Sequence, residues 1–432
     1  MRGAPLFALL CVLTASSVWA QGTPGRAPFS PIPCPALTWT LEDPSVTPLS
    51  GARTFVGRYE GGAYVIEIPN RWNGELALWA HGVVETTNSD GTVLRVQIPG
   101  DLRAHWLSRG FAWGTSSYRC NGNVPGIGLL DTMALRDVFR TVSGGRTPSR
   151  VYLAGASLGG RIVTLGLHEF PEAFAGGYAE CAAGQETNDV RVAIAAAAEF
   201  LSGVHPDSQT YSRDLSRMAQ VFGRGAELTE KGKQLASVQI ALTGGPRPFA
   251  FDGVVPRLLE NVRQGFMSSP DAHVRAATNE GIRYGLAPGL GLTPEVLDAG
   301  VPRKPADPSL RNPAGAFREV APFDGRLLRP LVTLHGTGDL QVPVSQQQAL
   351  KRAVLRSGQQ RMLVQRLVRA EGHCQFSSAE RLRAFDDLVS WVRDGVRPDG
   401  DDVLGDLSNA GWRFTDPVRP ADPGQPDAPS LR

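Results

Sequence analysis

The chain has 432 residues, of which 42% are hydrophobic and 20% charged, proportions typical of a globular protein and not of a disordered or fibrous one. Its length allows a large buried core. The 44 basic and 42 acidic residues leave a formal charge of +2, and like charges do not gather into long runs. Nucleic-acid binding therefore lacks its usual electrostatic basis, and we expect no nucleic-acid partner.

The first twenty residues have the pattern of a secretory signal peptide. Arg2 supplies a positive start, residues 6–13 form a short apolar core, and Val18 and Ala20 form a small-x-small type of cleavage site before Gln21. The apolar run is too short to span a bilayer. We therefore expect a mature protein that begins at Gln21, is secreted or periplasmic, and has no stable membrane anchor.

Four cysteines follow this segment: Cys34, Cys120, Cys181 and Cys374. In an oxidising compartment an even number of cysteines usually forms disulfides, and four cysteines can pair in three ways. No CxxC spacing occurs, so we expect neither a zinc site nor another metal.

Short apolar runs alternate with helical patterns along much of the chain. The runs predict buried strands at 62–69, 76–80, 111–117, 151–154, 174–178, 331–334 and 362–368. The helical patterns lie at 100–109, 129–142, 158–170, 345–356 and 377–395. Alternation of this kind predicts an α/β fold, in which helices flank a parallel sheet.

From 185 to 325 the alternation stops. This stretch shows helical windows near 189–203, 209–222, 227–241, 255–266 and 270–285 and no convincing strand. We interpret it as a helical cap inserted into the core. The resulting division is a signal peptide (1–20), an extended N-terminal leader (21–50), a core in two parts (51–184 and 326–396), the cap insertion (185–325) and a Pro- and Asp-rich tail (397–432) that adds little core.

The segment Gly155-Ala156-Ser157-Leu158-Gly159 matches the pattern GxSxG and lies between a predicted strand and a predicted helix. Small residues at such a turn let the chain reverse sharply, expose the serine oxygen and aim the helix N-terminus at a developing anion. A serine hydroxyl is a poor nucleophile near neutral pH and needs a base that a carboxylate orients. This context favours Ser157 as a nucleophile over a serine that merely occupies a glycine-rich turn.

Two later turns supply candidates for the acid and the base. Asp339 and His373 each come shortly after a predicted strand, and the order Ser157, Asp339, His373 is that of the alpha/beta-hydrolases. The sequence resembles this superfamily across most of 60–395, and residues 335–343 (HGTGDLQVP) resemble its acid turn. The resemblance implies an alpha/beta-hydrolase fold with a mostly parallel central sheet, Asp339 as the acid, His373 as the base, and no cofactor.

The same resemblance implies two backbone N–H groups that form an oxyanion hole. One belongs to Leu158, which follows the nucleophile, and the other to Val83 in the loop after the strand at 76–80. The alternative is that the preceding His81-Gly82 pair only turns the chain. His81 is a possible wall of the pocket. The remaining histidines lack partners in any motif and are expected to be packing or surface residues: His105, His168, His205, His273 and His335.

The pair His373-Cys374 resembles a feature of tannases and bacterial feruloyl esterases. In those enzymes a cysteine follows the catalytic histidine and is bonded to a cysteine directly before the nucleophile. Here Ala156 occupies that second position. Cys181 follows the predicted strand at 174–178, at the edge of the sheet where the nucleophile lies. We therefore favour a Cys181–Cys374 bond, which leaves the other two cysteines to pair, and the two other connectivities stay open.

The sequence thus predicts a secreted serine hydrolase that cleaves a small or medium carboxylic ester through an acyl-enzyme intermediate. A secreted serine peptidase of the aminopeptidase type is the first alternative, because fold and triad would be the same. A non-catalytic binding protein on a hydrolase scaffold is the second. The sequence does not specify the acyl and alcohol groups or the oligomeric state.

Overall fold

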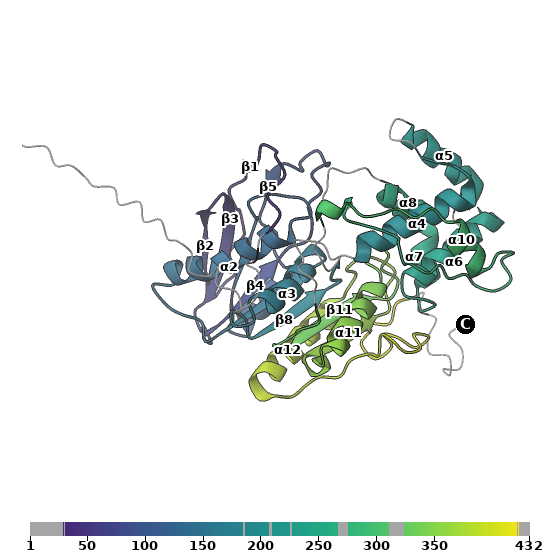
Figure 1. The fold of residues 1–432 in the computed structure, drawn as a ribbon. Coiled ribbons are helices and arrows are strands. Elements are labelled where there is room, and N and C mark those ends of the chain that lie inside the picture. Colours follow the sequence, from purple (N-terminus) through teal and green to yellow (C-terminus); the bar gives the residue numbers. More distant parts are fainter. Residues whose placement is uncertain are drawn as a thin grey trace, which may run out of the picture.

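The computed structural model describes residue 29 and residues 31–184, 186–206, 210–224, 227–266, 275–310, 324–420 and 422. The expected signal peptide lies outside the described residues. At the centre is an eight-stranded sheet in the order β12-β11-β8-β7-β4-β6-β3-β2 (Figure 1). Its strands are β2 (Ala52–Tyr59), β3 (Gly62–Pro69), β4 (Glu75–Ala80), β6 (Ala112–Ser116), β7 (Arg150–Ala156), β8 (Gly176–Glu180), β11 (Leu331–Gly336) and β12 (Leu363–Val368).

The sheet is mostly parallel. All pairs from β12 to β6 run parallel, whereas β3 is antiparallel to both β6 and β2. Every residue of β4, β6, β8, β11 and β12 is buried. Strands covered on both faces read as continuous apolar runs, which is why these strands were recognisable in the sequence. The predicted α/β fold class is confirmed.

Helices cover both faces of the sheet. Along β4, Leu76 and Leu78 face one layer, and Ala77 and Trp79 face the other, as expected for alternating side chains. The first layer consists of α2 (Pro125–Val142), α3 (Leu158–Glu169) and α11 (Ser345–Arg356), and the second of α1 (Asp101–Ser108) and α12 (Ser378–Asp394). In the second layer the rings of Trp106 and Phe385 pack against each other with centroids 5.3 Å apart and planes tilted by 57°.

The described chain between β8 and β11, residues 186–310, is largely helical and is called the insertion below. It contains α4 (Glu186–Ser202), α5 (Tyr211–Phe222), α6 (Glu230–Leu242), α7 (Ala250–Val254), α8 (Leu258–Phe266) and α10 (Pro294–Gly300). Its helices gather to one side of the sheet (Figure 1). They enclose an apolar core of their own, in which Met218, Phe222 and Leu235 are fully buried.

Two details of the insertion differ from the sequence prediction. A short antiparallel pair, β9 (Gly223–Arg224) and β10 (Glu227–Leu228), occurs where no strand was expected. The helix expected over 270–285 is wrong in its described part, because residues 277–285 form turns and irregular chain. The Asn279 side chain donates to the Tyr284 hydroxyl (2.9 Å) and to the Pro302 carbonyl (2.8 Å), and such side-chain bonds compete with helix formation.

The tail after residue 396 contributes to the core, contrary to expectation. Val403 and Leu407 are buried against Leu367 of β12. Arg369 and Asp422, whose side chains are both fully buried, form an ion pair at 2.8 Å. The tail also supplies a partner to the edge strand, because the Leu367 N–H donates to Asp401 Oδ2 at 2.7 Å. Covering an edge strand in this way blocks its pairing with another chain.

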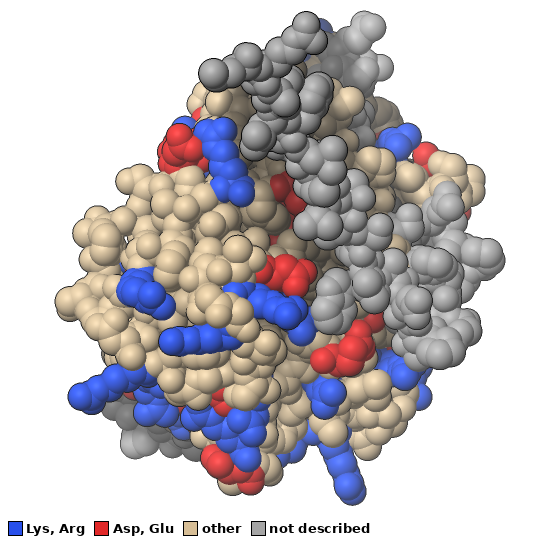
Figure 2. All heavy atoms as spheres, turned by 90° about the vertical axis from the view of Figure 1, so that its left-hand side faces the viewer, with Lys and Arg blue, Asp and Glu red and all other residues tan. Residues whose placement is uncertain are grey.

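The described part of the leader is irregular chain with one short strand. Its strand β1 (Thr40–Leu41) pairs with β5 (Val93–Leu94), and the Cys34–Cys120 disulfide joins it to the core with 5.9 Å between the two Cα atoms. Among the helices of the described chain, none has the length and apolar character needed to cross a membrane. On the face drawn in Figure 2, basic and acidic side chains lie among one another and among neutral ones.

Candidate active site

Ser157 lies at a sharp turn between β7 and α3. Its backbone has φ 57° and ψ −116°, a left-handed conformation that costs energy for a residue with a side chain. The glycines on either side permit this turn. A Cβ on Gly159 would overlap the carbonyl oxygen of Ala80 in β4, and a Cβ on Gly155 would crowd the carbonyl group of Gly159. The GxSxG pattern therefore reflects close approach of β4, β7 and α3.

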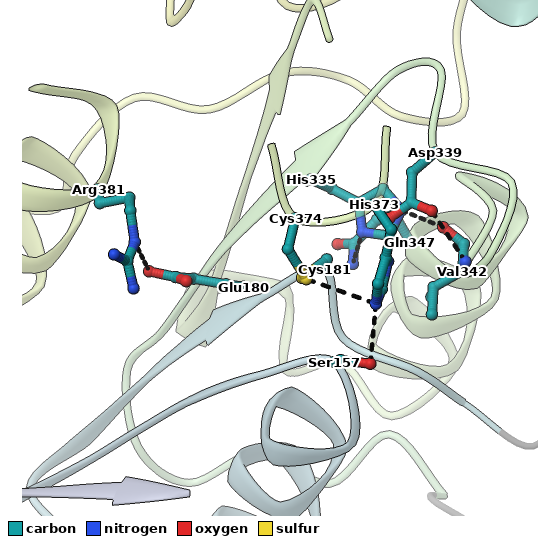
Figure 3. The surroundings of a disulfide bond; sticks show 10 residues. All are labelled: Ser157, Glu180, Cys181, His335, Asp339, Val342, Gln347, His373, Cys374 and Arg381. Carbon is teal, nitrogen blue, oxygen red and sulfur yellow. Dashed lines mark hydrogen bonds and ion pairs between the residues drawn. A yellow bond between two sulfur atoms is a disulfide. The ribbon is translucent and has the colours of Figure 1, made fainter. Parts of the chain in front are cut away.

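The structure brings the three predicted triad residues together (Figure 3). His373 Nε2 lies 2.9 Å from Ser157 Oγ, and His373 Nδ1 lies 2.7 Å from Asp339 Oδ2. A carboxylate accepts only, so Nδ1 carries the proton and Nε2 accepts from the serine hydroxyl. Asp339 is fully buried, whereas the His373 side chain is 18% exposed. These contacts are those of a serine nucleophile, a base and an orienting acid.

Asp339 sits in an environment that keeps its carboxylate charged. Burial alone would raise its pKa, but His373, the neighbouring His335 ring and the Val342 N–H together hold the pKa of Asp339 below its ordinary value. The Val342 N–H donates to Asp339 Oδ1 at 2.9 Å. From the insertion, Arg247 donates to the Thr337 carbonyl at 2.6 Å. Burial lowers the pKa of Arg247 to about 10, so it remains a cation near Asp339 at neutral pH.

The two residues predicted to supply the oxyanion donors lie beside Ser157. Leu158 begins α3, and both Leu158 and Val83 line the same pocket as Ser157. The loop after β4, which carries Val83, comes close to Ser157. A Cβ on Gly82 in this loop would lie 3.5 Å from Ser157 Cβ.

His81 lies beneath this loop rather than in the pocket wall. Its ring stacks on Tyr118 with centroids 3.8 Å apart and donates from Nδ1 to the Gly82 carbonyl at 2.6 Å. Burial lowers the pKa of His81 to about 4 and keeps the ring neutral.

A disulfide adjoins the triad. Cys374 directly follows His373 and is bonded to Cys181, the residue after β8, with 5.4 Å between the Cα atoms. The favoured connectivity, with Cys34 bonded to Cys120, is confirmed. The sulfur atoms of Cys181 and Cys374 and a nitrogen of His373 lie within 4.8 Å of one another. Because both sulfur atoms are in a disulfide, they do not offer the thiolates that a metal would bind.

A pocket of about 440 Å³ opens beside Ser157, between the core and the insertion. Most of the described side chains that line it are polar, and none is aromatic. The core contributes Val83, Glu85, Thr87, Asn88, Asn123, Ser157, Leu158, Arg161, Gln341 and Val342. The remaining lining residues are Ala183, Gly184, Thr187, Asn188, Arg191, Glu260, Arg263 and Gln264.

Sequence reasoning missed the residues that surround the acid. His335 was expected to be a packing or surface residue, and it is fully buried; its hydrogen bond to the Val342 carbonyl, next to the Asp339 turn, was not foreseen. Its position at the start of the HGTGD phrase was the only available signal. Gln347 and Arg247 belong to no motif. The other histidines lie elsewhere: His105 pairs with Asp386, His168 contacts the Arg326 carbonyl, His205 pairs with Glu199, and His273 lies outside the described residues.

No protein-family model matches the chain, and no curated protein matches it in sequence. Among solved structures, feruloyl esterase B from Aspergillus oryzae is similar over 86% of this chain and 87% of its own, at 13% identity and a TM-score of 0.46. An esterase from Aspergillus oryzae is similar over 85% and 86%, at 14% identity and a TM-score of 0.41. For acylaminoacyl peptidase from Pyrococcus horikoshii the shares are 82% and 44%, at 11% identity and a TM-score of 0.40.

The strand order and the turn at Ser157 described above are those of the alpha/beta-hydrolases, and the chain has the alpha/beta-hydrolase fold.

Proposed function

We propose that this chain is a serine hydrolase that cleaves carboxylic esters through an acyl-enzyme intermediate. The observation that carries the proposal is the unbroken hydrogen-bonded series from Ser157 Oγ through His373 to Asp339. This series ends in a buried, charged carboxylate and begins in a pocket large enough for a small substrate.

The geometry supports the following steps. His373 Nε2 takes the proton of Ser157, and Oγ attacks the ester carbonyl carbon. The N–H groups of Leu158 and Val83 stabilise the oxyanion. His373 then gives the proton to the departing alcohol, which leaves an ester between Ser157 and the acyl group. Water, deprotonated by His373, attacks that ester and releases the acid. Asp339 holds the Nδ1 proton and stabilises the charged imidazole throughout.

The polar pocket supports a short, hydrophilic ester as the substrate. The insertion supplies Asn188, Arg191 and Gln264 to its lining and would act as a cap over Ser157. A long acyl chain or aryl group would remove these side chains from water without offering them hydrogen bonds, which is costly. We therefore propose acetyl and similarly short acyl groups on a hydrophilic alcohol.

An aminopeptidase is the second candidate, because the pocket also contains carboxylates that could receive a substrate ammonium group. Of these, Glu260 is held by Arg263 through two hydrogen bonds of 2.9 and 2.6 Å. A carboxylate already paired in this way is a weaker partner for an ammonium group, so Glu260 adds little support for an aminopeptidase.

Labelling of the purified mature protein by a fluorophosphonate tests the proposal. We expect wild type and the control Ser149→Ala to be labelled and Ser157→Ala to be unlabelled. Ser157→Ala should also turn over nitrophenyl acetate several powers of ten more slowly, with an unchanged thermal transition. Faster cleavage of an aminoacyl anilide than of nitrophenyl acetate would instead indicate a peptidase. A wild-type protein that is neither labelled nor active would indicate a binding protein.

We also infer that the mature chain works outside the cytoplasm. Two disulfides support this location, because such bonds persist in oxidising compartments. Fractionation of expressing cells, followed by N-terminal sequencing of the product, tests it. Cleavage before Gln21 and recovery outside the cytoplasm are expected, and an intact cytoplasmic chain would contradict the inference.

A further inference from the structure

A second imidazole lies behind the acid of the triad. His335 is the fifth residue of β11, is fully buried, and precedes Asp339 by four residues. Its Nε2 lies 2.8 Å from the carbonyl oxygen of Val342 (Figure 3). The ring therefore contacts the far end of the same turn that carries Asp339.

A network of buried side chains sets the tautomer of this ring. Gln347 Nε2 lies 3.3 Å from His335 Nδ1. The orientation of the Gln347 amide is determined, because its Oε1 accepts from Thr333 Oγ1 at 2.7 Å and from Gln365 Nε2 at 2.9 Å. An amide nitrogen only donates, so Nδ1 of His335 accepts and its proton is on Nε2. The His335 ring thus donates to the Val342 carbonyl.

Val342 connects this ring to the acid. Its carbonyl accepts from His335, and its N–H donates to Asp339 Oδ1 at 2.9 Å. With Oδ1 held, Oδ2 is directed at His373 Nδ1, 2.7 Å away. The hydrogen bonds therefore run without a break from Gln347 through His335, Val342 and Asp339 to the base.

The charged groups around His335 agree with a neutral ring. Burial lowers the pKa of His335, the nearby carboxylate of Asp339 opposes this effect, and His373 and Arg247 add to it. Arg247 donates to the Thr337 carbonyl on the other side of the turn. A neutral ring that accepts at Nδ1 and donates at Nε2 satisfies both partners, and no aliphatic or phenyl side chain could do so.

We propose that His335 is a positioning residue that fixes Asp339 in the orientation the base requires. This inference rests on the proposed hydrolase function. A loosely held acid would stabilise the protonated imidazole less and would leave more of the His373 rings misdirected. Loss of the His335 N–H should therefore reduce turnover while leaving substrate binding in the pocket unchanged.

The test compares His335→Leu, which removes the donor, with His335→Gln, which keeps an N–H at a similar reach. His168→Leu serves as the control for losing a buried imidazole, because His168 lies in the last turn of α3, away from the pocket. With nitrophenyl acetate we expect kcat of His335→Leu to fall about ten- to a hundredfold, taking as the scale the loss seen when the hydrogen-bond partners of metal ligands are removed. KM should stay within about twofold, and the acidic limb of the kcat profile should move to lower pH.

His335→Gln should keep kcat within about fivefold of wild type, and His168→Leu should lower only the melting temperature. An unchanged kcat in His335→Leu, or an equal loss in the Leu and Gln variants, would overturn the proposal. If His335→Leu does not fold, Gln347→Leu tests the same series of hydrogen bonds and should lower kcat severalfold. An unchanged kcat and pH profile in Gln347→Leu would overturn the proposal. If the wild type is active and Ser157→Ala abolishes that activity, the proposed function holds. A failure of the His335 variants to behave as expected then counts against this inference alone.

Discussion

The backbone N–H of Ser157 donates to the carbonyl oxygen of Glu180 at 2.9 Å. Glu180 ends β8 and is followed by Cys181, whose sulfur is bonded to Cys374 beside His373. Ser157 and the loop that carries His373 are therefore fastened to the same strand end by one hydrogen bond and one disulfide. The loop that carries His373 owes its position partly to this covalent link.

Removal of this disulfide should therefore lower both activity and stability. We expect Cys181→Ala/Cys374→Ala to lose about 2–5 kcal/mol of unfolding free energy and at least about tenfold in kcat. Cys34→Ala/Cys120→Ala is the matched control, which should lose stability but keep kcat, because its bond joins the leader to the core. Denaturant unfolding and ester turnover of both double variants decide the matter. Equal kcat in the two variants would contradict a role in holding His373.

Arg247 should link the insertion to the triad. In Arg247→Met the Thr337 carbonyl loses its donor and Asp339 loses a nearby cation. We expect about 1–3 kcal/mol less stability and about three- to tenfold lower kcat, measured by urea unfolding and ester hydrolysis. Arg283→Met, also in the insertion but with a side chain 88% exposed, should change neither quantity appreciably. A stability loss without any change in kcat would limit Arg247 to a packing role.

His81 should make the fold sensitive to mild acid. Its pKa is about 4 in the folded chain against an ordinary value of 6.5, so between these values the unfolded chain binds more protons. Stability should then fall as pH decreases through this window, by up to about 1.4 kcal/mol per pH unit. His81→Phe, which keeps a ring on Tyr118, should flatten that part of the curve of unfolding free energy against pH. A slope equal to that of wild type would show that His81 is not the group responsible.

The polar pocket should discriminate against long acyl chains. We expect kcat/KM to fall from nitrophenyl acetate to nitrophenyl octanoate, and Gln264→Leu to raise the octanoate-to-acetate ratio severalfold, somewhat less than the roughly tenfold or more that one well-buried methylene contributes. Gln360 lies in the turn before β12, so Gln360→Leu serves as the control and should leave the ratio unchanged. A wild-type preference for octanoate would contradict the proposed substrate class.

Much of the site was accessible from sequence because its signals are local. The turn at Ser157 needs small residues on both sides, and Asp339 and His373 each follow a buried strand of a parallel sheet, whose carboxyl ends converge. Cys181 could be paired with Cys374 by the same reasoning.

The residues that were missed depend on tertiary contacts. Gln347 and His335 are polar side chains whose burial becomes favourable only when each finds the other's hydrogen-bonding group. The tail was misjudged because its Pro and Asp content conceals Val403 and Leu407, which bury themselves against β12. Composition describes a segment on its own, whereas an edge strand elsewhere in the fold determines whether that segment is covered.

The two disulfides also bear on how the chain is made. Among the described cysteines, Cys34 is bonded to Cys120, the one that follows it in the chain, and Cys181 is bonded to Cys374, the one that follows it. The two links therefore neither cross nor enclose one another. A chain that is oxidised as it emerges from a translocation channel would meet the correct partner first in each case. Its maturation would then require an oxidant for thiols but no isomerase to rearrange wrongly paired ones.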